Sequence, residues 1–197
     1  AAGTLWVATS RGVTQSTASG FVNLPLSGLP DRRVISIAVG PDGRVWCGTG
    51  LGLALWDGRA FRTVPGVPRI GVPAILHDRE GTVWVGTEAG LVRGGARGFE
   101  PVAWATHGQV LGLAQDHAGH LWVSYDDGVE EYFAGARLAR YTFGRRRTQQ
   151  VFVDSHDVVW VPTSGGIAWI DHGRSFLADD SKGLRLLDTR TVLEDRE

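Results

Sequence analysis

Several features are scarce in this sequence of 197 residues, and each absence excludes a class of structure or partner. The single cysteine, Cys47, cannot form an internal disulfide. It stands in "WCGT", where a related segment reads "WVGT", and this predicts a small buried hydrophobic side chain. The formal net charge of -1 offers no basic field to nucleic acid. No apolar run approaches the ~18 residues of a membrane helix, so we expect neither a nucleic-acid partner nor membrane insertion.

Helical periodicity is also missing, while glycine and tryptophan are abundant. No stretch keeps apolar residues at a sustained period of 3.6, so we expect almost no helix. The 28 glycines, which follow no collagen-like period, indicate many turns and therefore many short strands. With 43% apolar residues the chain can bury a substantial core. We predict one all-β domain over residues 1–197.

The tryptophans reveal an internal repeat. Trp6, Trp46, Trp84, Trp122 and Trp160 follow one another at intervals of 40, 38, 38 and 38 residues, each between hydrophobic neighbours. Repeats of about 40 residues are typical of stacked supersecondary units. A residue that recurs at one register in every unit most often packs between neighbouring sheets, and we assign that role to these indoles.

Each unit reads as four short antiparallel strands. An apolar run such as "VISIAV" at Val34 predicts the first strand, and the tryptophan segment predicts the second. Between them lies an Asp-x-x-Gly turn or a close variant, beginning at Asp78, Asp116 and Asp154, with "PDG" at Pro41 in its place in another unit. A glycine opens the third strand, and a further turn leads to the fourth.

The two ends of the chain are complementary halves of one unit. "TVLED" (Thr191 to Asp195) has the first-strand pattern, and "TLWVAT" at Thr4 supplies the second strand. Four-stranded repeats form a linear solenoid or a β-propeller, and these ends favour a five-bladed propeller closed by pairing of the C-terminal strand with the N-terminal strand. The predicted blades are 189–197 with 1–27, 28–66, 67–104, 105–144 and 145–188. Excision of five units from a longer array would leave the same ends.

The repeats resemble those of the two-component-regulator propeller family. "DREGTVWVGTEAGL" (Asp78 to Leu91) matches the family pattern at every defined position, and "DHAGHLWVSYDDGV" (Asp116 to Val129) lacks only its Gly-Thr pair. The resemblance implies a periplasmic or extracellular ligand sensor of the kind that bacterial hybrid histidine kinases carry, often for breakdown products of polysaccharides. It also implies a longer chain, with further repeats and downstream signalling domains as partners.

The sites where the units differ predict where a ligand binds. The loops from the fourth strand to the next first strand, and those from the second strand to the third, emerge on one face of a propeller, and here they carry diverse charged and aromatic residues. Guanidinium groups there would bind a carboxylate, sulfate or phosphate, and an indole would stack on a sugar. The predicted ligand-binding residues are Arg11, Arg33, Arg69, Trp104, His107, Asp126, Arg146 and Arg147.

No catalytic, cofactor or metal motif accompanies this face. His117, His120, His77 and His156 lie at or near turns, but no cysteine partner or metal-binding helix motif accompanies them, so we expect no metal site and no cofactor. Three hypotheses remain. They are a non-catalytic sensor of a small saccharide or anion, a protein-interaction scaffold or fragment of a larger receptor, and a propeller enzyme of the streptogramin-lyase kind. Of these we favour the sensor.

Overall fold

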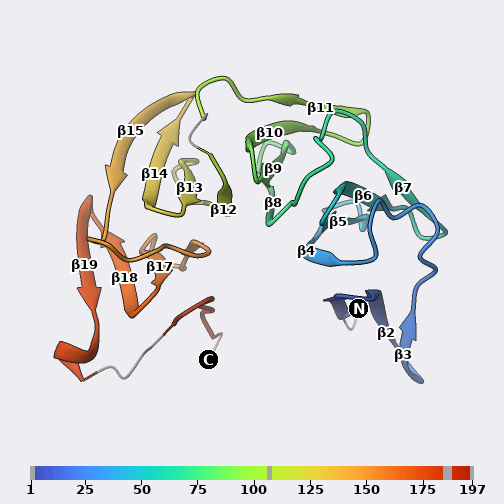
Figure 1. Ribbon diagram of the computed structural model, residues 1–197, viewed down its shortest axis with the longest axis horizontal. Coiled ribbons are helices and arrows are strands. Elements are labelled where there is room, and N and C mark those ends of the chain that lie inside the picture. The colour runs from blue at the N-terminus through green and yellow to red at the C-terminus, as the bar shows by residue number, and fades with distance from the viewer. Residues whose placement is uncertain (1–2, 106–107, 184–187, 196–197) are drawn as a thin grey trace. The chain divides into compact units, whose positions relative to one another are not determined.

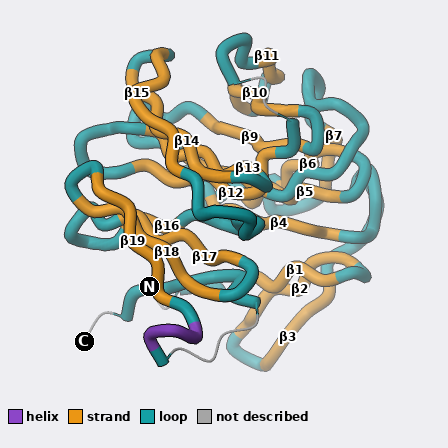
Figure 2. The backbone as a smooth tube through the Cα atoms, turned by 60° about the vertical axis from the view of Figure 1, so that its left-hand side comes forward, coloured by secondary structure: helices purple, strands orange, loops and turns teal. Residues whose placement is uncertain are grey.

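The computed structural model describes residues 3–105, 108–183 and 188–195. These residues form short β-strands joined by turns, with one 3-10 helix of three residues, η1 (Asp180–Lys182), which confirms the prediction of almost no helix (Figure 2). None of them belongs to a helix with the length and hydrophobicity of a membrane span. The chain divides into two compact units, residues 1–105 and 106–197, and each is described by itself.

The first unit contains three antiparallel sheets. Their strand orders are β1-β2-β3, β4-β5-β6-β7 and β11-β10-β9-β8 (Figure 1). The bounds are β1 (Trp6–Thr9), β2 (Gly12–Thr17), β3 (Gly20–Asn23), β4 (Val34–Val39), β5 (Val45–Thr49), β6 (Gly52–Trp56), β7 (Phe61–Thr63), β8 (Ala74–His77), β9 (Val83–Thr87), β10 (Gly90–Gly95) and β11 (Gly98–Pro101).

The second unit contains two sheets of four strands, each in chain order, β12-β13-β14-β15 and β16-β17-β18-β19. The bounds are β12 (Val110–Gln115), β13 (Leu121–Tyr125), β14 (Gly128–Phe133), β15 (Ala136–Tyr141), β16 (Phe152–Val153), β17 (Val159–Thr163), β18 (Gly166–Asp171) and β19 (Arg174–Ala178). Four sheets thus have the predicted four antiparallel strands, and in each of them the tryptophan segment is the second strand.

First strands of consecutive sheets lie side by side within each unit, β1 with β4 and β4 with β8 in the first, and β12 with β16 in the second. The approach is close enough to require glycine at some positions. A Cβ atom at Gly112 would lie 2.6 Å from the backbone nitrogen of Val151 on the neighbouring chain segment. The hydroxyl of Ser36 also donates to the carbonyl of Val72 at 2.7 Å, which joins two sheets of the first unit. Four-stranded antiparallel sheets whose first strands lie side by side are consistent with propeller blades.

The cores lie between neighbouring sheets. In the first unit one cluster joins Trp46 and Leu55 to Val85 of the next sheet, and in the second unit another joins Trp122 to Val161. The predicted packing role of the tryptophans is confirmed for Trp46 and Trp122, which are buried in these clusters. Cys47 is buried as predicted, and burial raises the pKa of its thiol to about 12.

The two ends differ from the sequence-based expectation. The sheet β1-β2-β3 has three strands rather than four, and residues 191–195 carry no strand assignment. Instead, the carboxylate of Glu194 accepts hydrogen bonds from the amide and hydroxyl of Ser155, at 2.9 and 2.6 Å. A strand pattern becomes a strand only where a ladder partner aligns with it, so the pairing of the two ends stays a prediction.

Candidate functional site

A hydrogen-bonded clasp recurs at the first turn of three sheets. The first aspartate of the turn accepts the indole N–H of the tryptophan six residues later, in the pairs Asp78–Trp84, Asp116–Trp122 and Asp154–Trp160, at 2.7, 3.0 and 2.8 Å. Its other oxygen accepts the backbone N–H four residues later, at 2.7 to 2.9 Å. We call this arrangement the Asp–Trp clasp. It explains the aspartates as turn formers, as predicted, and gives the buried indole N–H its partner.

Among the four-stranded sheets of the described residues, one lacks the clasp. Gly40 occupies the position of the clasp aspartate in the sheet β4-β5-β6-β7, although its turn has the same backbone hydrogen bonds. The carboxylate of Asp42 takes over the backbone part of the role and accepts the amide of Arg44 at 3.0 Å. The indole N–H of Trp46, a residue only 3% exposed, has no hydrogen-bond partner among the described residues, and neither has Nε2 of His77 beside it.

Three predicted ligand-binding arginines lie in loops of the first unit. Arg11 is in the turn between β1 and β2, Arg33 precedes β4, and Arg69 precedes β8. All three are exposed, and their guanidinium groups make no hydrogen bond or ion pair with any described residue. Their donors are therefore available to a ligand.

The surroundings of two predicted residues in the first unit are more specific. Arg11 lines a cavity of about 430 Å³ together with Thr14, Asn23 and Leu26. Trp104 is half-buried against Trp84, with ring centroids 6.0 Å apart and planes inclined by 54°. It is therefore one member of an aromatic pair rather than an isolated platform.

In the second unit the predicted arginines are already paired with carboxylates. Arg147 Nε donates to Asp126 Oδ1 at 2.6 Å, and Arg146 donates to Asp179 Oδ2 at 2.6 Å. The pair between Arg147 and Asp126 is largely exposed, so its contribution to stability is at most about 1 kcal/mol. An anion would have to displace these carboxylates. The remaining predicted residue, His107, lies outside the described residues.

A buried charge network that the sequence did not indicate holds the outer strand of the sheet β12-β13-β14-β15. The side chain of Glu130 is 0% exposed and accepts hydrogen bonds from Arg137 at 2.8 Å and Arg140 at 3.2 Å. The hydroxyl of Tyr132 donates to the other carboxylate oxygen. Burial and this bond to Glu130 raise the pKa of Tyr132. Because both arginines belong to β15, the network fastens that strand to β14.

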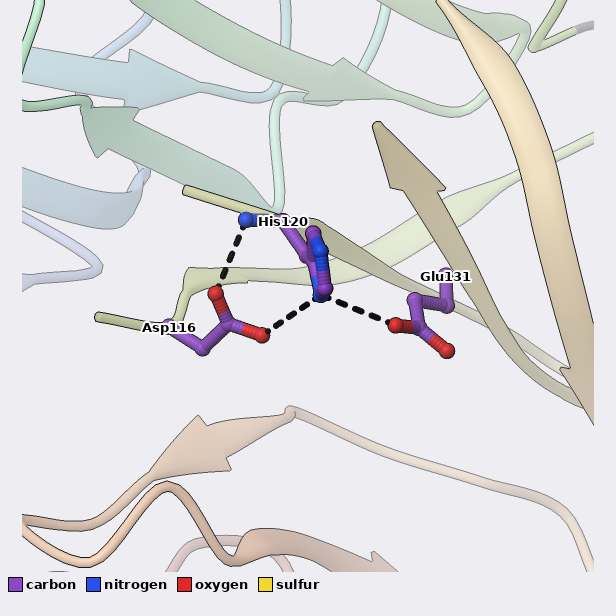
Figure 3. A group of neighbouring side chains, drawn as sticks. All are labelled: Asp116, His120 and Glu131. Atoms are coloured by element: carbon purple, nitrogen blue, oxygen red, sulfur yellow. Dashed lines mark hydrogen bonds and ion pairs between the residues drawn. The ribbon is translucent and has the colours of Figure 1, made fainter. Parts of the chain in front are cut away.

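The same sheet brings together a histidine and two carboxylates (Figure 3). Nδ1 of His120 lies 3.1 Å from Asp116 Oδ2 and 2.9 Å from Glu131 Oε1. The side chains of Asp116, Glu131 and His120 are 9%, 14% and 28% exposed. A nitrogen and two carboxylate oxygens within 4.8 Å of one another are a possible set of metal ligands.

Asp116 and Glu131 face a cavity of about 360 Å³ between the two sheets of the second unit. The other polar residues in its lining belong to the last sheet and its turns, and they are His156, Asp157, Asp171 and His172. No lysine or arginine lines it. Two of these acids already contact histidines, because a carboxylate oxygen of Asp157 lies 2.6 Å from His117 Nδ1 and one of Asp171 lies 2.6 Å from His172 Nδ1.

Sequence reasoning missed this cluster, although the signal was available. In the hairpin of β13 and β14, Tyr125 lies opposite Gly128 at the turn. Three residues further from the turn on each strand, Trp122 therefore lies opposite Glu131. The clasp then brings Asp116 to the same side of that strand pair. The spacing of the histidines along the chain does not reveal the cluster, because its members approach one another across the strands.

Comparison with known proteins identifies the repeat. Residues 28–50 and 66–89 match the sequence profile of the family described as two component regulator propeller, which confirms the resemblance of the repeats. No curated protein matches the sequence.

Solved structures share the fold at low sequence identity. The extracellular domain of BT3049 from B. thetaiotaomicron, named as a hybrid two component system, has a TM-score of 0.81 and 19% identity, over 100% of this chain and 29% of that one. For BT4673 of the same organism the values are 0.74 and 22%, over 84% and 25%. Virginiamycin B lyase from Staphylococcus aureus gives 0.74 and 14%, over 90% and 66%. The chain spans less than a third of these two extracellular domains, and the similarities establish the fold alone.

Proposed function

Because residues 28–50 and 66–89 are repeats of the two component regulator propeller type, we propose that the chain is a non-catalytic ligand-recognition segment of a bacterial sensor. Two similar structures are extracellular domains of proteins named as hybrid two component systems, and this chain covers 29% and 25% of them. We accordingly propose a periplasmic or extracellular location and signalling partners supplied by a longer chain.

The ligand that this proposal favours is a small anion or an acidic saccharide. The observation that carries it is the availability of three exposed guanidinium groups, on Arg11, Arg33 and Arg69, in contrast to Arg146 and Arg147, which already hold carboxylates. A guanidinium binds a carboxylate, sulfate or phosphate through two parallel hydrogen bonds. The cavity beside Arg11 offers hydroxyl and amide groups for the neutral part of such a ligand.

A binding screen with charge-reversal variants tests this proposal. Oligosaccharides with and without uronate or sulfate groups are titrated into the chain by calorimetry. A lost charge-assisted contact of about 2 kcal/mol weakens binding roughly 30-fold, and we expect this for R11E, R33E or R69E with an acidic ligand. The matched control is R59E, in the exposed turn between β6 and β7. Equal loss in the control, or no binding by any acidic ligand, contradicts the proposal.

Two alternatives have a specific observation behind them. The small share of the sensor domains that the chain covers favours a segment of a larger receptor that contacts other blades, and recovery of ligand binding only in the longer protein would support it. The similarity to virginiamycin B lyase over 90% of this chain is the observation behind the second alternative, a propeller enzyme. Sustained turnover of a cyclic ester would support that reading over simple binding.

Closure of the five sheets belongs to the same proposal. We propose that residues 191–195 add the fourth strand beside β1, whose one ladder partner among the described residues is β2. The pattern of Thr191 to Asp195 repeats that of Ala74 to Asp78, which begins with β8. By the register of Ile75 opposite Val85, Val192 would lie opposite Val7, so mild oxidation of the variant V7C/V192C should give an intramolecular disulfide in the monomer. The control V7C/L138C uses an exposed leucine of β15. Disulfide-linked dimers as the main product would contradict closure within one chain.

A further inference from the structure

The sheet β12-β13-β14-β15 carries chemistry that the other clasped sheets lack. His120 supplies the backbone N–H that the clasp aspartate accepts, and Glu131 lies opposite the clasp tryptophan in the strand register. The first position is held by Thr82 and Val158 in the other two clasped sheets, and the second by Arg93 and Trp169. The clasp therefore needs neither an imidazole nor a second carboxylate.

One ring nitrogen of His120 lies between two carboxylates and cannot donate a separate hydrogen bond to each of them. One ring nitrogen, Nδ1, lies within hydrogen-bonding distance of two carboxylates, Asp116 at 3.1 Å and Glu131 at 2.9 Å. A neutral imidazole carries at most one hydrogen on that atom. Asp116 also accepts the indole N–H of Trp122 and the amide of His120, and Glu131 accepts the hydroxyl of Tyr141 at 3.5 Å. These donors are uncharged, and the lining of the cavity includes no lysine or arginine, so the two carboxylates meet no Lys or Arg cation there. A cation bound by all three groups would satisfy them together.

We propose that Asp116, His120 and Glu131 form a binding site for one divalent transition-metal ion of the zinc class. Calcium and magnesium prefer oxygen ligands, whereas an imidazole nitrogen with two carboxylates suits zinc and its neighbours in the first row. Three protein ligands leave a fourth position to a water molecule. Asp116 and Glu131 both line the cavity of about 360 Å³, which gives that water its place.

The geometry needs only a small adjustment. Two ligand atoms bound at ~2.1 Å in a tetrahedral site lie roughly 3.4 Å apart. The distances from His120 Nδ1, 3.1 and 2.9 Å, would have to lengthen by a few tenths of an ångström. Rotation of the Glu131 side chain, on β14, lengthens the second distance, and a small rotation of the His120 side chain lengthens the first.

The ligands are also oriented by their neighbours, as metal ligands usually are. Asp116 is fixed by the amide of His120 at 2.8 Å and the indole of Trp122 at 3.0 Å. The imidazole of His120 meets the ring of Phe133 edge to face, with centroids 5.1 Å apart. The site is therefore largely preformed before a metal arrives.

A second cluster, Asp154, His156 and Glu194, is less suited to a metal. One oxygen of Asp154 accepts two backbone amides, and both oxygens of Glu194 accept hydrogen bonds from Ser155. His156 and Glu194 are exposed. This cluster serves as an internal comparison.

Calorimetric titration of the chelator-treated chain with zinc chloride tests the proposal. We expect one high-affinity site, with binding weakened roughly tenfold or more in H120A and in E131Q. E131Q keeps the shape of the side chain but removes its charge. Asp116 is not altered, because its clasp stabilises the turn. The controls are H172A and H156A, each of which removes another imidazole from the same cavity, and His156 is also a member of the second cluster. Cobalt provides an independent readout, since its visible absorption reports tetrahedral coordination.

The outcomes separate clearly. Loss of the site in H120A and E131Q, with circular dichroism unchanged and with H172A and H156A still binding, supports the proposal. Absence of stoichiometric zinc binding overturns it and assigns the three residues to a structural ion-pair network. Binding that survives in H120A, or that disappears in H156A, also overturns it. None of these results depends on the arginine loops, so the proposed sensor function is tested separately.

Discussion

Installing the missing Asp–Trp clasp should stabilise the sheet β4-β5-β6-β7. The double variant G40D/D42A places a carboxylate where the other sheets have the clasp aspartate, and its alanine corresponds to Ala118 of the turn at Asp116. Pro41 then occupies the second position of the turn, where proline is favoured. The backbone at Gly40 is not in the left-handed region, so a side chain introduces no backbone strain there.

The expected magnitude follows from two contributions. Leaving the buried indole N–H of Trp46 without a partner costs about 1–3 kcal/mol, which the new carboxylate would recover in part. Replacing glycine stabilises by about 0.4–1 kcal/mol through the unfolded chain. Against this, a Cβ atom at Gly40 lies 3.1 Å from His77 Cε1, so the imidazole must move slightly. The same Cβ atom would also lie 2.8 Å from Asp42 Oδ1, and the D42A substitution removes that contact. We expect a net gain of about 1–2 kcal/mol.

Thermal and urea unfolding measure this gain, which corresponds to roughly 2–8 °C in midpoint for a chain of this size. The matched control is D78A, which breaks the existing clasp with Trp84 and should cost about 2–4 kcal/mol by leaving two donors unsatisfied. D42A alone should destabilise, because the amide of Arg44 loses its acceptor. If G40D/D42A is no more stable than the parent while D78A is destabilised, the clasp acts through something other than the indole hydrogen bond.

Three further predictions concern buried and ionised groups. E130A should lower the free energy of unfolding by about 1–3 kcal/mol in urea titrations, because Tyr132 and two partly exposed arginines lose their shared buried acceptor, whereas an unchanged stability would contradict the network. Burial tends to raise the pKa of Asp154, but the hydrogen bonds from Trp160 and two amides outweigh it, so the folded pKa lies below the ordinary 3.8. The contribution of Asp154 to stability should therefore be complete above pH 3.8 and lost as the pH falls through the folded pKa, and D154N should flatten that acid limb of the stability profile. Burial raises the pKa of Cys47 to about 12, so a thiol reagent at neutral pH should react only at the rate of unfolding.

The repeated elements were predictable from sequence because their signals are local. The spacing of the tryptophans placed the second strands, and the turn residues at Asp78 and Asp116 gave the correct turns. The clasp itself was not predicted, since the aspartate and the tryptophan each had a sufficient explanation alone. Only the structure shows that one carboxylate serves both the turn and the indole.

The loop residues were harder to predict for a physical reason. That Arg147 meets Asp126, and Arg146 meets Asp179, depends on the path of an irregular loop, which no periodic pattern encodes. The cluster of Asp116, His120 and Glu131 depends on hairpin register instead, and that could have been worked out from the turn at Gly128.

The clasp also bears on how the chain reaches its folded state. It joins residues only six positions apart, so its formation closes a very short loop and requires no neighbouring sheet. Hairpins that carry it can become ordered early, as each one leaves the ribosome, and then offer an edge on which later strands assemble. The hairpin at Gly40 has no such fastening, and we expect it to be the slowest of the four to become protected against amide hydrogen exchange.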